Sequence, residues 1–202
     1  MALMELRRFR ARDGREVILR SPRWSDLDDM LELVNSLVEE GAEVNLCEPY
    51  NREDEADWLA ELLASVEKGD RISVVAEVEG HVIGHVEVRI GRCYEGHTGV
   101  LGIAVKRGYR DLGIGTELMK EAEQQARGRG LKLITLEVFA TNSRAIHVYE
   151  KLGYRVIGRV PKGIYKDGRY IDRILMAKEL HSDEACDHPS SGDAGMKVSS
   201  ES

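Results

Sequence analysis

A glycine-containing turn at residues 105–116 (VKRGYRDLGIGT) is the feature that most constrains the fold of this chain. It follows residues 100–105 (VLGIAV), a nearly unbroken apolar run that is typical of a central strand covered on both faces. The apolar positions after the turn recur at helical spacing and predict an amphipathic helix: Ile114, Leu118, Ala122 and Ala126. A strand pattern at residues 131–139 follows, so the segment predicts a strand, helix, strand unit.

The turn carries two glycines at the predicted start of this helix. Gly113 and Gly115 let backbone N–H groups crowd together there, and unpaired donors at a helix N-terminus favour an anion. Arg110, three residues before Gly113, can add a charge-assisted hydrogen bond to the same anion. The segment therefore predicts a site that fits a pyrophosphate group.

Two other phosphate-binding motifs do not fit this turn. The dinucleotide-binding fingerprint needs a glycine three residues after Gly115, where the chain has Leu118. The P-loop needs a Gly-Lys-Ser/Thr sequence, which the chain lacks. A Gly-x-Gly turn alone also fits a plain connection between a strand and a helix, so the other motifs of the chain have to decide.

Hydrophobic periodicity elsewhere predicts further strands and helices. The strand patterns lie at residues 16–20, 71–78, 82–90, 154–159 and 170–180. Helices are predicted to begin at Ser25 through a capping box, near Asn51 and at Asn142. The first of them is expected to present five apolar side chains on one face: Leu27, Met30, Leu31, Val34 and Val38. We expect Trp24 and Trp58 to pack in the core or between helices.

Composition separates the last residues from the others. Residues 181–202 contain six serines and no Leu, Ile or aromatic residue, which predicts a disordered tail after a single domain at residues 1–180. The tail holds five acidic side chains and one lysine, so residues 1–180 carry a net charge of only −3. That near balance gives no electrostatic reason to expect a nucleic acid as ligand.

The cysteines, histidines and apolar runs limit the compartment and the ligands. Cys47, Cys93 and Cys186 form no Cys-x-x-Cys pair and leave one thiol unpaired, which predicts reduced thiols in a cytoplasmic protein. No stretch approaches the roughly 20 apolar residues of a transmembrane helix, so no membrane partner is expected. His81 and His85 lack the helical spacing of a zinc pair, and we expect no metal.

Arg110, Gly113 and Gly115 match the Arg/Gln-x-x-Gly-x-Gly/Ala signature of the GNAT superfamily of acyl-CoA-dependent N-acyltransferases, which the chain resembles. Residues 136–154 (LEVFATNSRAIHVYEKLGY) are similar to the second cofactor-binding and catalytic motif of that family, closest to its ribosomal-protein N-terminal acetyltransferases. The resemblance implies an α/β (α+β) fold in which a mixed, mainly antiparallel sheet is flanked by helices. It also implies an acetyl-CoA-dependent N-acetyltransferase that needs no metal.

The resemblance further implies how acetyl-CoA, the co-substrate, would be held. It would lie between the strand that ends at Val105 and the strand that ends at Phe139, with its pantetheine against the backbone of Ile103 and Val105. Backbone N–H groups of residues 112–116 would hold the pyrophosphate. Besides the two glycines, this segment comprises Leu112, Ile114 and Thr116. Asn142 would contact the pantetheine arm or cap the following helix, and the sequence leaves both roles open.

Tyr149 is the residue that the resemblance assigns to acid catalysis. The thiolate that leaves the thioester has to be stabilised or protonated, and a phenol with an ordinary pKa of about 10 is a suitable donor. Tyr149 also falls on the apolar face of its predicted helix, so a packing role is the alternative. Glu137 occupies the position of the base in ribosomal-protein N-terminal acetyltransferases. Glu87, Glu95 and His97 are competing candidates for the base.

The expected reaction is direct attack of a primary amine on acetyl-CoA in a ternary complex. Loops near residues 41–52 and 159–172 would select the acceptor, which is either a protein N-terminus or a small-molecule amine. Tyr165, Tyr170 and Asp172 are candidate acceptor-site residues, and cross-strand packing and surface charge explain them equally well. The alternative function is a non-catalytic acyl-CoA-binding or regulatory module. The sequence leaves open whether the chain forms a homodimer.

Overall fold

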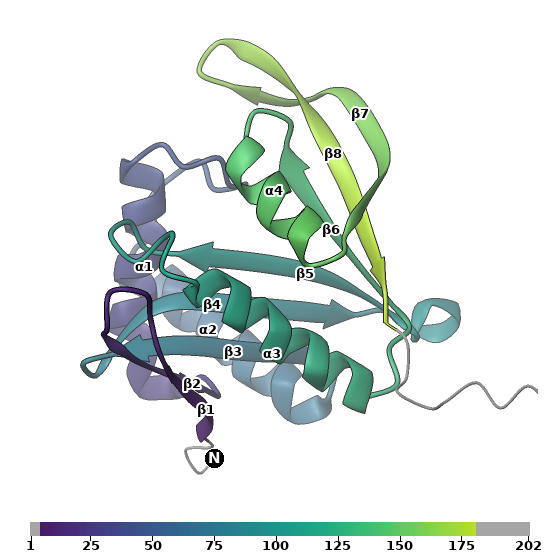
Figure 1. The fold of residues 1–202 in the computed structure, drawn as a ribbon. Coiled ribbons are helices and arrows are strands. Elements are labelled where there is room, and N and C mark those ends of the chain that lie inside the picture. The colour runs from purple at the N-terminus through teal and green to yellow at the C-terminus, as the bar shows by residue number, and fades with distance from the viewer. Residues whose placement is uncertain (1–4, 181–202) are drawn as a thin grey trace, which may run out of the picture.

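The computed structural model describes residues 5–180, which form one sheet with helices on both faces (Figure 1). The strands are β1 (Glu5–Arg10), β2 (Glu16–Arg20), β3 (Arg71–Val78), β4 (His81–Ile90), β5 (Thr98–Val105), β6 (Leu133–Phe139), β7 (Arg155–Lys166) and β8 (Arg169–Glu179). The helices are α1 (Leu27–Glu39), α2 (Arg52–Lys68), α3 (Ile114–Gly128) and α4 (Ser143–Lys151). The predicted tail at residues 181–202 lies outside the described residues.

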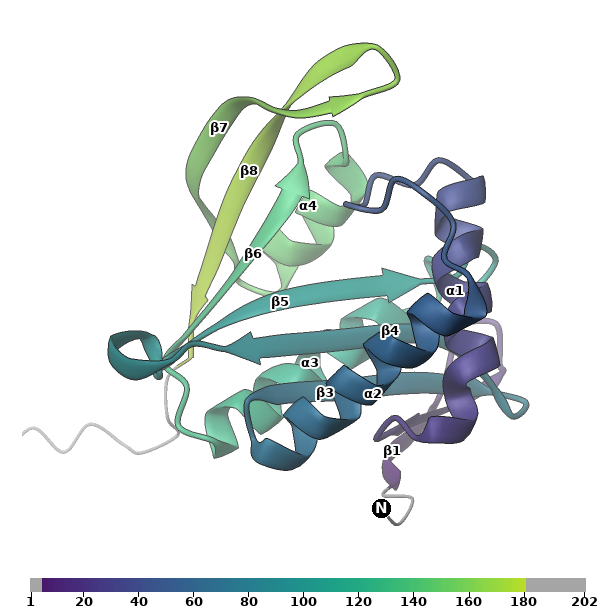
Figure 2. The same cartoon turned by 180° about the vertical axis from the view of Figure 1, so that it is seen from behind.

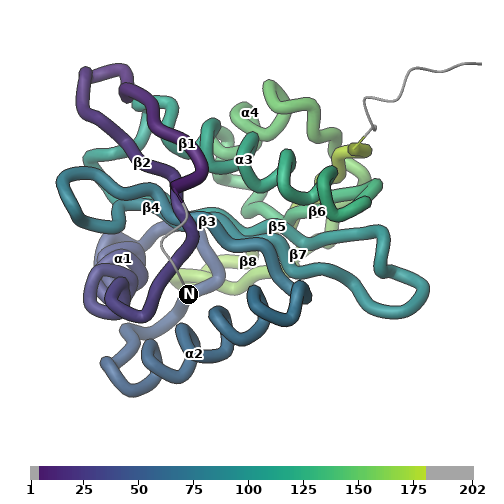
Figure 3. The backbone as a smooth tube through the Cα atoms, turned by 90° about the horizontal axis from the view of Figure 1, so that it is seen from below, coloured from purple at the N-terminus to yellow at the C-terminus, as the bar shows by residue number. Residues whose placement is uncertain are grey.

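The order of the strands in the sheet is β1-β2-β3-β4-β5-β6-β8-β7. Only the pairing of β5 with β6 is parallel within residues 5–180, as expected for two strands joined through a helix. Figure 3 shows α1 and α2 on one side of the sheet and α3 and α4 on the other. These observations confirm the predicted mixed, mainly antiparallel α/β (α+β) fold with flanking helices.

Local turn chemistry explains the two hairpins β3–β4 and β7–β8. Glu79 and Gly80 connect β3 to β4 with φ values of 52° and 86°, and Asp167 and Gly168 connect β7 to β8 with values of 50° and 75°. Two successive residues with positive φ are the mark of a type I′ turn, whose twist matches that of antiparallel strands. Both hairpins were therefore predictable from a pair of adjacent residues.

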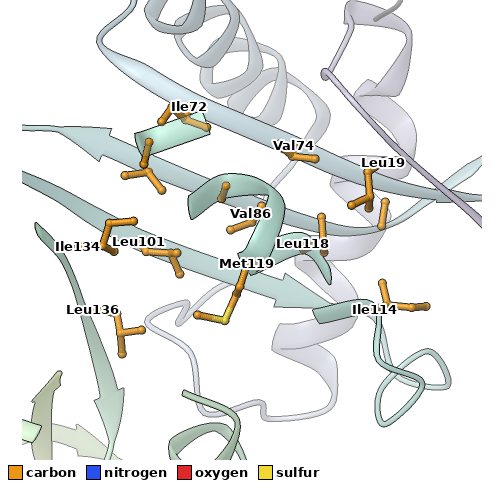
Figure 4. Packing of buried hydrophobic residues seen from close by; sticks show 14 of the residues in the cluster. Leu19, Ile72, Val74, Val86, Leu101, Ile114, Leu118, Met119, Ile134 and Leu136 are labelled. Carbon is orange, nitrogen blue, oxygen red and sulfur yellow. The ribbon is translucent and has the colours of Figure 1, made fainter. Parts of the chain in front are cut away.

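The main core lies between α3 and the sheet. Ile114, Leu118 and Met119 of α3 point toward side chains of β3, β4 and β5, as Figure 4 shows. The same helix buries Ala122 and Ala126, so its predicted apolar face is confirmed. This packing holds the first turn of α3 against the end of β5 and thereby positions the glycine-containing turn.

A β-bulge changes which side chains of β4 enter the core. Ala76 pairs with Gly84 but Glu77 pairs with Val82, so Ile83 is an extra residue in β4. Beyond the bulge the strand faces are exchanged. Val82 packs with Met30 on the side of α1, whereas Ile83 joins the core beneath α3. Strict alternation along residues 82–90 would place Val82 on the face of Val86 and Val88, and the bulge moves it to the other face.

Other sequence predictions were wrong at the N-terminal end. The strand β1 was not predicted because its side chains are mostly exposed and show no alternation. Helix α1 starts at Leu27 after a 3-10 turn at Trp24–Asp26, with no capping box at Ser25. Its buried residues besides Leu27 and Met30 are Leu33 and Leu37, in place of the predicted Leu31, Val34 and Val38. Trp24 is 53% exposed rather than packed.

The start of α1 is anchored by a buried ion pair. The Arg20 guanidinium at the end of β2 donates two hydrogen bonds to the Asp26 carboxylate, of 2.7 and 2.8 Å, and a third of 2.5 Å to Glu77. Arg20 and Asp26 are almost completely buried. The Asp26 carboxylate also accepts a bond from the Arg23 backbone N–H. It is thus fully engaged outside the helix, which explains why it does not cap α1.

The helices of the described residues are all too short or too polar to cross a membrane. The closing strand predicted at residues 154–159 is longer than expected, because β7 extends to Lys166. The register of β7 against β8 shifts between Val160 and Ile164, around Pro161. A proline cannot donate a ladder hydrogen bond, and β7 is an edge strand, where this loss is tolerated.

Candidate active site

The strands β5 and β6 diverge after a short stretch of parallel pairing (Figure 2). Their pairing ends where Val100 meets Thr135, and between Leu101 and Val105 the outer edge of β5 meets no strand within residues 5–180. A cleft of about 710 Å³ opens here, lined by both strands, by α3 and α4, and by the loop after α1. The prediction that residues 100–105 are covered on both faces was wrong, because Val100 is 40% exposed beside this cleft.

The backbone of β5 presents hydrogen-bonding groups to the cleft. The Lys106 N–H donates to the Ile83 carbonyl of β4, at 2.9 Å. Because successive residues of a strand point their backbone groups to opposite edges, Ile103 and Val105 direct theirs away from β4. Both residues line the cleft. These are the two residues that the sequence analysis expected to contact pantetheine.

The first turn of α3 reaches the same cleft at Gly115. Gly113, the N-cap residue, has a φ of +88°, and no side chain within the described residues caps the helix. The backbone N–H groups of the first turn are therefore left for an anion. A Cβ on Gly115 would lie 3.6 Å from Val105 Cγ2 and 3.8 Å from Ile103 Cδ1. A larger side chain at Gly115 would project into the space beside β5.

The other residues of the segment 112–116 do not line the cleft. Ile114 is fully buried in the core and Leu112 packs against it. Thr116 is half-buried and, like Leu112, Gly113 and Ile114, does not line the cleft. Any contact of these residues with a ligand would involve their backbone N–H groups.

Arg110 has protein partners in the structure. Its Nε donates to the Val105 carbonyl at 2.8 Å, and its Nη2 donates to the Glu40 carboxylate near the end of α1. Arg110 lines the cleft together with Glu40 and with Arg144, which forms an ion pair of 3.0 Å with Asp111. The sequence analysis missed Glu40 and Arg144, because neither belongs to a local motif.

Asn142 has one of the two roles that the sequence left open, that of a helix cap. Its side-chain oxygen accepts a hydrogen bond of 3.1 Å from the Ala145 N–H and so caps α4. The residue also lines the cleft. A cap at this position fixes the start of α4 and therefore the direction of the Tyr149 side chain two turns later.

Tyr149 lines the cleft from α4, opposite β5. Its ring lies against that of Tyr154, with 6.1 Å between the centroids, and its hydroxyl forms no hydrogen bond within residues 5–180. Burial raises the pKa of the Tyr149 hydroxyl to about 12. The phenol is therefore protonated at neutral pH and has a proton to donate.

The candidate bases are not all placed in the cleft. Glu137 of β6 lines it, is 53% exposed and forms an ion pair of 3.2 Å with Arg173. Glu87 of β4 lies at a neighbouring cavity and pairs with Arg71 at 3.2 Å. Glu95 and His97 are exposed before β5 and line neither cavity.

The β7–β8 hairpin places its candidate residues outside the cleft. Tyr165 and Tyr170 are cross-strand neighbours whose exposed rings lie 5.0 Å apart. Asp172 forms an ion pair of 2.6 Å with Arg159 and accepts a bond from the Lys162 N–H. These contacts, the backbone bond first, hold the pKa of Asp172 below its ordinary value. Ile164 is the residue of β7 that reaches the cleft.

A second cavity of about 300 Å³ adjoins the cleft on the side of α1 and α2. Gly102, Ile103 and Ala104 of β5 line both. The second cavity is also lined by Trp58 and by two buried polar side chains, Glu55 of α2 and His85 of β4. Glu55 was not predicted as a site residue. Trp58 packs against two buried clusters, as predicted, and also lines this cavity.

His85 makes stability dependent on pH. Its Nε2 lies 2.8 Å from the Ser73 hydroxyl, and burial, helped by nearby Arg71, lowers its pKa to about 4. Between pH 6.5 and pH 4 the unfolded chain takes up a proton that the folded chain does not. The free energy of unfolding should therefore fall by about 3 kcal/mol from this group as the pH drops through that range.

Urea denaturation from pH 4 to pH 7 tests this prediction on the protein and on His85→Gln. The difference in unfolding free energy between the two should change with pH in this range. A pH-independent difference for His85→Gln would mean that His85 titrates normally in the folded state.

No group of three His, Cys, Asp or Glu side chains among residues 5–180 is arranged to hold a metal ion. The cleft offers the phenol of Tyr149, carboxylates that include Glu137, several guanidinium groups and backbone donors. Such a set can position a thioester and move protons.

Comparison with known proteins agrees with this geometry. A family model described as the acetyltransferase (GNAT) family matches residues 32–154, which include β5, α3, β6 and α4. An N-alpha-acetyltransferase of Sulfurisphaera tokodaii is 30% identical over 182 residues, which are 84% of this chain and 97% of that protein. An L-methionine sulfoximine/L-methionine sulfone acetyltransferase of Pseudomonas paraeruginosa is 24% identical, over 80% of this chain and 94% of that protein.

A solved structure shares the fold over most of its length. The crystal structure of ribosomal-protein-alanine N-acetyltransferase from Brucella melitensis superposes with a TM-score of 0.72 at 27% sequence identity. The match covers 80% of this chain and 99% of that one. The names of these two proteins thus give different acceptors, a ribosomal-protein alanine for one and L-methionine sulfoximine or L-methionine sulfone for the other.

Proposed function

The chain belongs to the acetyltransferase (GNAT) family and is an acetyl-CoA-dependent N-acetyltransferase, and we propose that the cleft between β5 and β6 is where it transfers the acetyl group to a primary amine. The observation that carries the proposal is the junction of three features in one cleft. These are the open edge of β5, the uncapped first turn of α3 and the Tyr149 side chain.

The residues of the cleft fit acetyl-CoA. In the proposal, backbone N–H groups of residues 112–116 hold the pyrophosphate, and the backbone of Ile103 and Val105 pairs with the pantetheine arm. The Val105 carbonyl already accepts from Arg110, so its N–H is the group left for a ligand. The contact between Arg110 and Glu40 links α1 to the glycine-containing turn. When acetyl-CoA binds, Arg110 would release Glu40 and donate to a phosphate oxygen instead.

Acetyl-CoA supplies an activated thioester, and the chain's own groups would provide orientation and proton transfer. Backbone N–H groups of β5 polarise the carbonyl. Tyr149 donates its proton to the leaving sulfur, and Glu137 accepts a proton from the attacking amine, directly or through water. A cytoplasmic location belongs to the same proposal, because the chain's three cysteines suit a reducing compartment.

The function is tested by mixing the protein with acetyl-CoA and a panel of amines that includes peptides, amino acids and polyamines. Release of free CoA that depends on the amine, together with a mass increase of one acetyl group on that amine, is the expected result. Tight binding of acetyl-CoA with no transfer to any member of the panel would contradict the proposal.

Gly115→Val should weaken acetyl-CoA binding by roughly 10- to 100-fold, the equivalent of one lost hydrogen bond to a charged group. The added methyl groups would fill the space between α3 and the side chains of Ile103 and Val105. Isothermal titration calorimetry measures the effect. Gly128→Val, at the other end of α3 in open space, is the matched control and should bind normally. If a folded Gly115→Val variant bound acetyl-CoA with normal affinity, the glycine-containing turn would not be the pyrophosphate site.

A further inference from the structure

The second cavity lies where an acceptor would approach the acetyl group. Gly102, Ile103 and Ala104 of β5 form a wall common to this cavity and the cleft. If acetyl-CoA occupies the cleft as proposed above, its reactive end lies against this stretch of β5. A molecule in the second cavity then reaches the thioester from the side of α1 and α2.

The charged side chains that line the second cavity are acidic. Two carboxylates, Glu55 and Glu87, line it, and no lysine or arginine does so within residues 5–180. Most of the other walls are apolar, formed by Met30, Leu33, Val34, Leu37, Leu46 and Trp58. The cavity therefore favours a cation on an apolar body and disfavours an anion.

Glu55 is the carboxylate that lacks a partner. Its side chain is 2% exposed, lines the cavity and forms no hydrogen bond or ion pair within residues 5–180. Glu87, by contrast, is paired with Arg71. Burial raises the pKa of the Glu55 carboxyl to about 7, which reflects the cost of an unpaired charge there. A bound cation would remove that cost.

Asn45 adds a neutral donor to the same cavity. This exposed residue lines both the cavity and the cleft, and its side-chain amide has no hydrogen-bond partner within residues 5–180. An amide N–H suits a neutral carbonyl oxygen. A free amino acid would instead place its carboxylate, two bonds from the nitrogen, close to the unpaired carboxylate of Glu55.

We propose that the second cavity binds the N-terminal residue of a peptide or protein, with the α-ammonium beside Glu55 and an apolar first side chain against the walls. Glu55 is thus a specificity-determining residue that rejects free amino acids. This inference rests on the proposed function and narrows its acceptor.

The test compares L-leucinamide, L-leucine and isoamylamine as acceptors. The first two differ covalently only in a neutral amide against a carboxylate, and the third lacks the carbonyl group. Because these groups also change the pKa of the amine, each kcat/KM is expressed per concentration of unprotonated amine. We expect kcat/KM for leucinamide to exceed that for leucine by roughly 100-fold, the effect of a few kcal/mol from like charges. Glu55→Gln should reduce that preference by about 10-fold or more with acetyl-CoA affinity unchanged. Glu67→Gln, an exposed glutamate on the same helix, should leave it unaltered.

Calorimetry with CoA bound gives a readout that needs no turnover, and leucinamide should bind more tightly than leucine to the protein and less tightly to Glu55→Gln. If Glu55→Gln does not fold, Glu55→Asp takes its place. It keeps the negative charge and should retain part of the preference for leucinamide over leucine. Equal use of leucine, a preference unchanged in Glu55→Gln, or a preference for isoamylamine would each overturn the inference. Selective binding of leucinamide without any transfer would instead count against the proposed function alone.

Discussion

Tyr149→Phe is expected to leave acetyl-CoA affinity unchanged and to lower kcat by roughly 10²- to 10⁴-fold, the usual range for a lost general acid. The substitution keeps the ring that packs against Tyr154 and removes only the hydroxyl in the cleft. That hydroxyl has no hydrogen bond within residues 5–180, so its loss should not lower stability. Steady-state kinetics and calorimetry on the same preparation measure the two quantities.

Tyr154→Phe is the matched control for this prediction. It makes the same chemical change in the adjacent ring, and the buried Tyr154 hydroxyl also lacks a hydrogen-bond partner in the described part of the chain. Tyr154 does not line the cleft, so its variant should keep a normal kcat. If Tyr149→Phe turned over normally while acetyl transfer limited the rate, Tyr149 would be a packing residue.

Asp26→Ala should lower the free energy of unfolding by about 3–5 kcal/mol, because it leaves the buried Arg20 without its main partner. Glu77 would remain as the only carboxylate bonded to that guanidinium within residues 5–180. The loss is expected in urea denaturation at neutral pH, with the slope of the transition unchanged.

Asp28→Ala is the matched control for the buried pair. Asp28, two residues after Asp26, forms an ion pair of 2.9 Å with Arg52, but both side chains are largely exposed. Exposed pairs of this kind contribute little to stability. A similar small effect for Asp26→Ala would show that Arg20 is compensated by Glu77 alone.

Local features of the sequence predicted much of the fold. The hairpin turns at Glu79-Gly80 and Asp167-Gly168 depend on two adjacent residues, and α3 depends on apolar residues within a few turns of one another. The glycine-containing turn at Gly113 and Gly115 was predictable for the same reason. The proposed catalytic roles of Tyr149 and Glu137 came from a family motif, and their kinetic tests decide them.

Errors arose where distant segments decide a local arrangement. The Ile83 bulge depends on the pairing of β4 with β3 and exchanges the faces of Val82 and its neighbours. The start of α1 depends on Arg20, which draws the Asp26 carboxylate into a buried ion pair. Neither contact leaves a periodic pattern in the sequence.

By itself, the sequence determined the order of the strands and helices around the glycine turn, because periodicity and turn residues act over a few positions. The tertiary structure alone decided that β5 and β6 part after Val100 and that Arg110 meets Glu40, seventy residues away. It also decided that Glu55 of α2 faces the same cavity as Ala104 of β5. Such neighbours depend on how helices and strands cross and on their register, and these are set only when the whole core packs.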